Sequence, residues 1–333
     1  MEQNWFWRRA GMRAGLAFGA ATGGRLVAEG LAMDPVMSAL VRFVRRRPPD
    51  AGDIKKLRVG YAALLALAGL RPDPTVTMEK LTIPGLLPAR AYAPNGKHGG
   101  TEHRGALKHR GTLLYFHGGG FIMGSPAVRD GMCQRLAAGT GLRVVSAGYR
   151  LAPEHPFPAA HDDAAAALAW VRRQGGGPLL VGGDSAGANL AAGLARDGGV
   201  DGQVLIYPVV DMVQSAGLYP SLDAFADGYL LTAAGMEACA QALIPPGVDR
   251  DQARLSPIRA DLSRAAPALI VVAGFDPLRD QGVAYAEALR AAERPVELLE
   301  EGALVHGFAD FAGVVPEARR AVDRMARMVR AMV

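Results

Sequence analysis

The sequence predicts an α/β fold in which a mostly parallel sheet of eight strands is flanked by helices and carries a helical cap. Three observations support this prediction. Short strand-like runs alternate with helical runs from about residue 75 onward. The chain has 333 residues, of which 50% are hydrophobic, so it can bury one large core. Two helix-rich stretches, residues 1–70 and 212–257, stand outside the alternation.

Eight runs have the length and composition of β-strands. The first two are interpreted as an opening hairpin, and several of the others are almost continuously apolar. The strands of a parallel sheet have this composition because helices cover both of their faces. The eight runs are residues 75–83, 89–93, 112–118, 142–149, 178–184, 203–210, 268–274 and 295–300.

Helical runs lie between the later strands and connect them along the chain. Alternation of this kind predicts a doubly wound sheet with right-handed crossovers. The helical runs are about residues 126–139, 157–174, 186–196, 276–293 and 314–332.

The two helix-rich stretches are expected to pack together as a cap over one edge of the sheet. Residues 1–70 supply its first part, and residues 212–257 complete it, because that stretch is longer than a simple crossover requires. The sheet domain then comprises residues 71–211 and 258–333. For residues 1–30, a mobile segment is left open as an alternative.

The positive charge of the chain is concentrated near its start. Residues 1–60 hold eleven Lys/Arg against five Asp/Glu, a net charge of +6, while the whole chain carries +5. Arg42 and residues 45–47, all arginine, could contact anionic lipid or nucleic acid. Aromatic side chains do not interleave with them, so we favour a solvated helix face and expect no nucleic-acid partner.

The cysteines and the apolar runs bear on the location of the protein. Cys133 and Cys239 show neither a metal-ligand spacing nor a disulfide framework, which favours a reducing compartment, the cytoplasm. No run of 18 apolar residues is present, so we expect no transmembrane helix. Arginines 8, 9 and 13 precede a short apolar stretch that resembles a signal peptide, but glycines interrupt it.

A serine stands between two glycines where the fifth predicted strand ends and a helix begins, in Gly183-Asp184-Ser185-Ala186-Gly187. At so sharp a turn the backbone approaches the following helix closely, and side chains at the two glycine positions would clash. The turn exposes the Ser185 hydroxyl at a helix N-terminus, where N–H groups favour negative charge. This context is typical of a nucleophilic serine. An incidental Gly-Ser turn is the alternative.

A nucleophilic serine needs a base and a group that orients the base. Asp276 directly follows one predicted strand, and His306 lies a few residues after the last one. The order Ser185, Asp276, His306 is that of α/β-hydrolase triads. Taken singly, Asp276 also fits a helix N-cap before Pro277, and His306 fits a loop histidine. Asp280 is an alternative acid.

Three glycines directly after the third predicted strand, Gly118, Gly119 and Gly120, allow backbone N–H groups to point at a ligand. They do not form a phosphate loop, because no G-K-[ST] follows. Their N–H groups and that of Ala186 are expected to form an oxyanion hole, with Gly119 and Gly120 preferred among the glycines. His117 is expected to anchor this loop by hydrogen bonds rather than to act as a base.

Together these motifs resemble those of the hormone-sensitive-lipase-like carboxylesterases, or bacterial family IV esterases, of the α/β-hydrolase superfamily. The resemblance covers about residues 30–330, and its motifs are highly specific in combination. Asp184 is typical of the branch with G-D-S-A-G rather than G-T-S-A-G. The motifs are HGGGF (117–121), YRLAPEHPFPAA (149–160), GDSAGANLAA (183–192), YPVVD (207–211), FADGYLLT (225–232), DPLRD (276–280) and HGF (306–308).

The resemblance implies an α/β-hydrolase fold with Ser185, Asp276 and His306 as the catalytic triad. It also implies a cap made from the N-terminal helices and the 212–257 insertion, and a role for Asp184 beside His117 in anchoring the loop. Three positions depart from the family pattern without touching the triad, namely His161 in place of an apolar residue, Ala188 in place of a common glycine and Gln281 in place of a common glutamate.

The resemblance implies a serine carboxylesterase that hydrolyses short- to medium-chain carboxylic esters through an acyl-enzyme intermediate. This chemistry needs no metal and no organic cofactor. The same triad can hydrolyse amides, lactones or carbamates, which stay open as alternatives. A non-catalytic small-molecule receptor is a further alternative, against which His306 argues. The expected partner is a small-molecule ester, without stable membrane insertion, and the sequence is compatible with a homodimer.

A loop of residues 95–110 contains three histidines among glycines and basic residues. Because the histidines lack a regular ligand spacing, we expect a solvated hairpin loop rather than a metal site. They are His98, His103 and His109.

Overall fold

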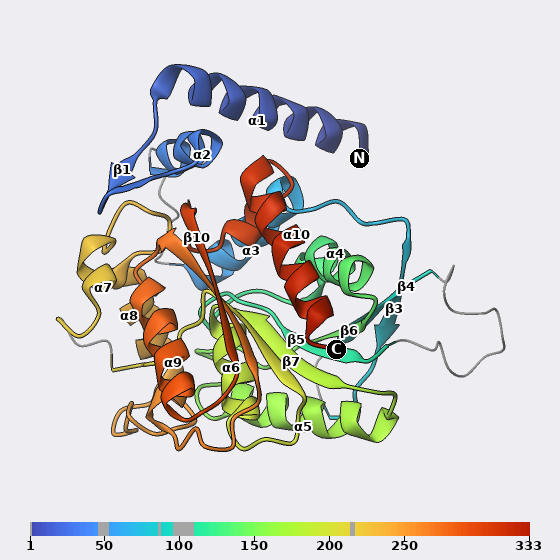
Figure 1. The fold of residues 1–333 in the computed structure, drawn as a ribbon. Coiled ribbons are helices and arrows are strands. Elements are labelled where there is room, and N and C mark those ends of the chain that lie inside the picture. Colours follow the sequence, from blue (N-terminus) through green and yellow to red (C-terminus); the bar gives the residue numbers. More distant parts are fainter. Residues whose placement is uncertain (1, 46–52, 86–87, 96–109, 214–216) are drawn as a thin grey trace.

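The computed structural model describes residues 2–45, 53–85, 88–95, 110–213 and 217–333. Its centre is an eight-stranded sheet with the strand order β10-β9-β8-β7-β5-β6-β4-β3 (Figure 1). The strands are β3 (Val76–Leu81), β4 (Ala89–Pro94), β5 (Thr112–Phe116), β6 (Arg143–Ala147), β7 (Leu179–Asp184), β8 (Gly202–Ile206), β9 (Ala268–Phe275) and β10 (Val296–Val305).

The sheet is mostly parallel, as predicted. Strand β4 pairs antiparallel with β3 and with β6, while every other pair of neighbours is parallel. The predicted opening hairpin is therefore β3–β4. The carboxyl ends of β5, β7, β9 and β10 meet at one edge of the sheet, because these strands run in the same direction.

Helices cover both faces of the sheet and create a separate core on each. In β5, Leu113 and Tyr115 point into one core, while Leu114 and Phe116 point into the other, as the alternation along a strand requires. The first core contains α4 (Asp130–Thr140) and α10 (Pro316–Ala331). The second contains α5 (Ala159–Gln174), α6 (Ala186–Ala195) and α9 (Arg279–Ala291). The continuous apolar character of the strands follows from this double burial.

Two of the predicted helices begin later than expected. The run 126–139 starts as a 3-10 turn, η1 (Pro126–Arg129), before α4. The run 276–293 becomes helical only at Arg279, because the Asp276 side chain accepts a hydrogen bond from the Leu278 N–H at 2.8 Å and closes a turn first.

The N-terminal segment is helical, as predicted, and consists of α1 (Glu2–Gly23), α2 (Pro35–Arg45) and α3 (Ile54–Ala68). Helix α1 lies along the outside of the molecule with α2 beneath it (Figure 1). Buried Arg9 ties α1 to the end of α3 through a hydrogen bond to the Gly69 carbonyl. A hairpin of two-residue strands, β1 (Val27–Ala28) and β2 (Leu31–Ala32), was not predicted, because such short strands leave no periodic signal.

The 212–257 segment is less helical than expected. It contains the single turn α7 (Pro220–Ala224) and the longer α8 (Ala233–Leu243), and the 3-10 turn η2 (Pro257–Arg259) follows it. Helix α8 begins at Thr232, whose hydroxyl accepts a hydrogen bond from the Gly235 N–H at 3.0 Å.

Within the described ranges, no helix is long and apolar enough to cross a membrane. The same ranges hold no cluster of three or more His, Cys, Asp or Glu side chains suited to a metal ion. The histidines of the 95–110 loop lie outside the described residues.

Candidate active site

Ser185 occupies the turn between β7 and α6 in a conformation that only a tightly constrained backbone maintains. Its φ is +54° and its ψ is −117°, a region that costs a non-glycine residue about 1–3 kcal/mol. A Cβ at Gly183 would lie 2.4 Å from the Gly187 carbonyl carbon, and a Cβ at Gly187 would lie 2.0 Å from the Phe116 oxygen. The clash predicted for side chains at the two glycines is therefore confirmed.

Ser185, His306 and Asp276 form one hydrogen-bonded chain at the carboxyl edge of the sheet. His306 follows β10, and its Nε2 lies 3.0 Å from Ser185 Oγ. The other ring nitrogen, Nδ1, lies 2.8 Å from Asp276 Oδ2. With the proton on Nδ1, Nε2 is the acceptor for the serine hydroxyl. The Tyr207 ring packs against the imidazole at a centroid distance of 4.7 Å and limits its rotation.

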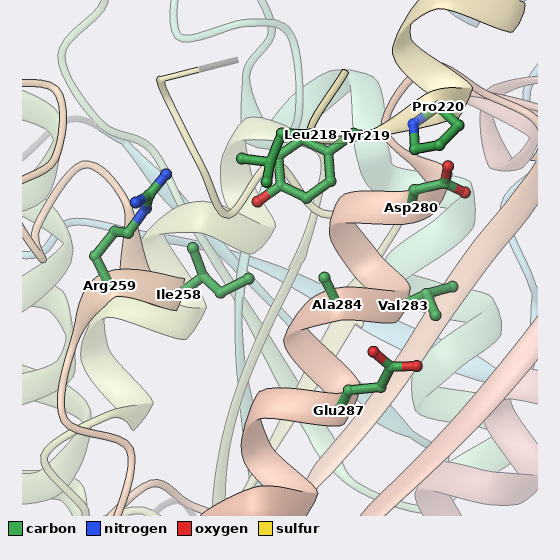
Figure 2. Close-up of a pocket in the computed structure, with 9 residues that line it drawn as sticks. All are labelled: Leu218, Tyr219, Pro220, Ile258, Arg259, Asp280, Val283, Ala284 and Glu287. Carbon is green, nitrogen blue, oxygen red and sulfur yellow. The ribbon is translucent and has the colours of Figure 1, made fainter. Parts of the chain in front are cut away.

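Asp280, the alternative acid, lies elsewhere. It accepts a hydrogen bond from the Ser221 N–H at 2.7 Å and forms an ion pair with Arg279 at 2.8 Å. Figure 2 shows its carboxylate in the first turn of α9, beside Pro220, at the rim of a groove of about 500 Å³. None of the residues that line this groove belongs to the Ser185–His306–Asp276 chain. Asp280 therefore caps α7, whereas Asp276 contacts the histidine.

In the glycine loop, the structure contradicts the prediction for Gly118. The Gly118 N–H donates to Asp184 Oδ1 at 3.0 Å, so this N–H is already engaged and is not a free oxyanion donor. The prediction for Gly118 was wrong because the Asp184 side chain comes from β7 and nothing in the glycine run itself indicates the contact. The same Asp184 oxygen accepts a hydrogen bond from the Tyr115 hydroxyl at 2.8 Å, which fixes the carboxylate below the loop.

The next two glycines adopt backbone conformations that favour glycine. Gly119 has a φ of +123° and Gly120 a φ of +59°. A Cβ would lie 2.2 Å from the Met123 oxygen at the first position and 2.5 Å from Cys239 Sγ at the second. Both glycines line the cavity above Ser185, together with Ala186. Their N–H groups are thus in the right part of the molecule to meet an oxygen of a bound substrate.

His117 holds the start of this loop. Its Nδ1 lies 2.9 Å from the Gly118 oxygen, and the Tyr149 hydroxyl donates to the His117 carbonyl at 2.7 Å. The two rings are stacked at 4.3 Å. Burial lowers the pKa of His117 to about 4, so the ring is neutral at pH 7. A neutral, buried ring in contact with the loop fits the expected anchoring role.

Two of the departures from the family pattern have local partners. His161 places Nε2 3.2 Å from Asn189 Oδ1 and packs between the Phe121 and Phe157 rings. Gln281 Oε1 accepts backbone N–H groups of residues 210 and 211 at 3.2 and 3.1 Å. A neutral amide suits that position because Asp211 is itself fully buried beside it.

A cavity of about 590 Å³ opens above the serine, within the range of about 300–1,000 Å³ that is usual for small-molecule sites. Ser185, His306 and the glycine loop form its floor. Its remaining walls come mainly from α3 and α8 and are largely apolar. These wall residues include Leu57, Tyr61, Leu64, Met236, Cys239, Ala240 and Leu243.

Sequence reasoning missed a buried charge cluster in the same cavity. Arg129, at the end of η1, contacts Asp184, Asp310 and Tyr61. Asp310 lies in η3 (Phe308–Phe311), four residues after His306. The members come from four separate parts of the chain, so no spacing in the sequence indicates the cluster.

Comparison with known proteins identifies the family. A protein family described by the alpha/beta hydrolase fold matches residues 113–310. The chain belongs to this family. Carboxylic ester hydrolase LipN of Mycobacterium tuberculosis is 38% identical over 313 residues, covering 86% of this chain and 80% of LipN. Carboxylesterase NlhH of the same organism is 42% identical over 320 residues, covering 90% of this chain and 96% of NlhH.

Solved structures agree with this assignment. The ester-hydrolase EH1AB1 from the metagenome of Lake Arreo, solved with a derivative of bipyridine phosphonate, aligns with a TM-score of 0.79 at 32% identity. The alignment covers 89% of this chain and 96% of EH1AB1. The predicted fold, the resemblance to hormone-sensitive-lipase-like esterases and the enzyme class, a carboxylic ester hydrolase, are confirmed.

Proposed function

We propose that this α/β-hydrolase cleaves carboxylic esters with Ser185 as nucleophile, His306 as base and Asp276 as the group that orients the base. The chain of hydrogen bonds from Ser185 Oγ through His306 to Asp276, at 3.0 and 2.8 Å, is the observation that carries the proposal. His306 takes the hydroxyl proton as Ser185 attacks the ester carbonyl. It then returns the proton to the departing alcohol, and water repeats the sequence on the acyl-enzyme.

Backbone N–H groups of Gly119, Gly120 and Ala186 are proposed to stabilise the oxyanion of the tetrahedral intermediate. Gly119 and Gly120 adopt positive φ values beside the serine, and Ala186 begins α6, whose N-terminal N–H groups favour negative charge. Donors that are fixed in advance need no reorganisation as the charge develops, which makes them effective in catalysis. Asp184 supports the proposal because it holds the loop through Gly118.

The segments 1–70 and 212–257 are proposed to act together as a cap over a domain made of residues 71–211 and 258–333. This proposal is supported by the cavity, whose upper walls come from α3 and α8. Arg58 attaches α3 to two loops, with two hydrogen bonds to Glu154 at 2.8 and 2.7 Å and one to the Ile122 oxygen at 2.7 Å.

The limited volume and largely apolar walls of the cavity favour short- to medium-chain acyl groups. Each added methylene contributes at most about 0.8 kcal/mol while room remains in the pocket. Once the pocket is full, further carbons are strained or left in water. The specificity constant should therefore rise over the first few carbons of the acyl chain and then fall.

The partner is proposed to be a small-molecule ester encountered in the cytoplasm. Both cysteines, Cys133 and Cys239, are free, which supports a reducing compartment. A homodimer stays a prediction.

A panel of p-nitrophenyl esters from acetate to palmitate, with a matched anilide for each acyl group, tests the proposed reaction. We expect hydrolysis of the shorter esters, a maximum at a short or medium chain, and much slower cleavage of the anilides. The Ser185→Ala variant should be inactive on every substrate. Faster cleavage of anilides than of esters would favour an amidase instead, and binding without turnover by the wild type would favour a receptor.

A further inference from the structure

The buried cluster around Arg129 links three parts of the site. The Arg129 Nη2 donates to Asp184 Oδ2 at 2.7 Å and to the Tyr61 hydroxyl oxygen at 2.8 Å, while Nη1 donates to Asp310 Oδ1. The Tyr61 hydroxyl in turn donates to Asp310 Oδ2 at 3.0 Å. Only 4% of the Arg129 side chain is exposed, so water does not replace these contacts.

Each partner of Arg129 is connected to a different functional element. Asp184 directly precedes Ser185, and its second oxygen holds the oxyanion loop through the Gly118 N–H. Asp310 closes the turn that follows His306. Tyr61 belongs to α3 and lines the wall of the cavity.

The charges in this cluster make Arg129 indispensable to its arrangement. Burial raises the pKa of Asp310 to about 6, although the neighbouring Arg129 lowers it. Two carboxylates, Asp184 and Asp310, thus share one guanidinium. Loss of a buried partner charge is strongly destabilising because the remaining charges are left uncompensated. The Arg129 cation between the two carboxylates offsets their mutual repulsion and so favours the observed alignment of the loops attached to them.

We propose that Arg129 is a positioning residue that couples the seating of helix α3 on the cavity to the alignment of the nucleophile, the oxyanion loop and the histidine loop. The inference rests on the proposed roles of Ser185 and His306. Arg129 lines the cavity, but its hydrogen bonds go to Asp184, Asp310 and Tyr61, so it acts on the site through these residues. Tyr61 belongs to α3, and its hydroxyl contacts both Arg129 and Asp310. A shift of α3 would therefore displace the same cluster.

The variant Arg129→Lys tests the coupling directly. Lysine keeps the positive charge but cannot present a planar fork to two carboxylates. We expect kcat for an acetate ester to fall about 10²-fold, the usual cost of a misplacement of about 1 Å, with KM little changed. Rates are divided by the number of active sites titrated with a phosphonate, so that a loss of folded protein does not count as a loss of turnover.

Tyr61→Phe provides a milder variant that keeps the ring in place. Loss of one hydrogen bond should reduce kcat per titrated site about 2- to 10-fold. In the Arg129→Lys background the same change should cost less than in the wild type, because both residues act through one cluster. Arg135→Lys is the matched control. Its ion pair with Asp323, at 2.7 Å, joins α4 to α10 at the surface, and the control should turn over like the wild type.

Unchanged kcat per titrated site in both Arg129→Lys and Tyr61→Phe would overturn the inference, as would losses confined to the number of titratable sites. Strictly multiplicative losses in the double variant would also overturn it. A wild type that neither hydrolyses esters nor reacts with the phosphonate would instead refute the proposed function, so the two failures are distinguishable.

Discussion

The carboxyl edge of the sheet and the N-terminal helices are built by different kinds of contact. At the edge, Ser185 and the loop glycines are fixed by backbone geometry, with close approaches that exclude any side chain. The N-terminal helices are held by side chains that join distant parts of the chain. Tyr61 and Asp310 are separated by 249 positions, and Arg58 and Glu154 by 96. Close backbone approaches shape the turn that presents Ser185, whereas side-chain hydrogen bonds attach the helices that line the pocket.

The largest expected effect on kcat distinguishes two aspartates that lie four positions apart. Asp276→Asn should lower kcat about 10⁴-fold, because an amide stabilises the wrong tautomer of His306. Asp280→Asn should leave turnover within a few-fold and act mainly on stability, because Asp280 caps α7 through the Ser221 N–H. Steady-state kinetics on one short ester checks both. An equal loss in the two variants would mean that the structure assigns the acid wrongly.

Matched glycine substitutions in the loop beside Ser185 and in α1 sharpen the comparison and have the next largest expected effect. Gly119→Ala should lower kcat about 10²- to 10³-fold, as loss of one oxyanion donor does, because a Cβ there meets the Met123 oxygen at 2.2 Å. A Cβ at Gly15 in α1 would have no heavy atom within 4 Å, so Gly15→Ala should leave kcat unchanged. It should also raise the free energy of unfolding by about 0.4–1 kcal/mol. Turnover by Gly119→Ala at the wild-type rate would remove this loop from the mechanism.

A change in the attachment of α3 should alter selectivity more than chemistry. Arg58→Met removes the two hydrogen bonds to Glu154 and the bonds to the Ile122 and Ala152 oxygens. The kcat/KM for a hexanoate ester should fall about 2- to 10-fold, the size of effect of one net hydrogen bond, because α3 is displaced rather than lost, while the acetate ester is almost unaffected. A series of esters of increasing acyl-chain length measures the ratio of kcat/KM for hexanoate to kcat/KM for acetate. A uniform loss on all esters would show that α3 does not shape the pocket.

The smallest effect concerns stability in acid and leaves turnover at neutral pH unchanged. Burial lowers the pKa of His117 and of His161 to about 4, so between pH 6.5 and 4 the unfolded chain binds protons that the folded chain excludes. Stability therefore falls as pH falls through that window, by about 1–2 kcal/mol per histidine between pH 7 and pH 5. The pKa of Asp310 is raised to about 6, so the folded chain binds this proton before the unfolded chain does. Asp310 therefore opposes the trend, but it is one group against two histidines.

Urea unfolding at pH 7 and pH 5 checks this prediction with His161→Leu as the matched variant. The variant should lose most of the acid sensitivity, because the one remaining buried histidine is then largely offset by Asp310. Equal sensitivity in the variant and the wild type would remove His161 as a source of the effect.

Features set by short stretches of sequence could be predicted. The strand ends and the G-D-S-A-G turn depend on neighbours within a few residues. Ser185, Asp276 and His306 each lie just after a strand, and they meet as expected. The start of α9 was misjudged by three residues, because the turn that Asp276 closes competes with the helix.

Features set by distant side chains could not be predicted. Asp184 was expected to anchor the glycine loop, but Gly118 was still assigned a free N–H, because the sequence does not show which N–H a carboxylate 66 positions away accepts. The Arg129 cluster was missed for the same reason, since Tyr61 and Asp310 are brought to Arg129 only by the fold. A buried charge leaves no periodic pattern, and its partners become visible only in three dimensions.

The central claim, that Ser185 is the nucleophile of an ester hydrolase, is tested most directly by labelling with an organophosphonate and mapping the adduct by peptide mass spectrometry. The proposed mechanism predicts one adduct per chain, located on Ser185, with loss of esterase activity in proportion to labelling. The Asp276→Asn variant should react far more slowly, because its His306 cannot activate the serine. An adduct on another residue with Ser185 unmodified, or full esterase activity after complete labelling of Ser185, would contradict the account.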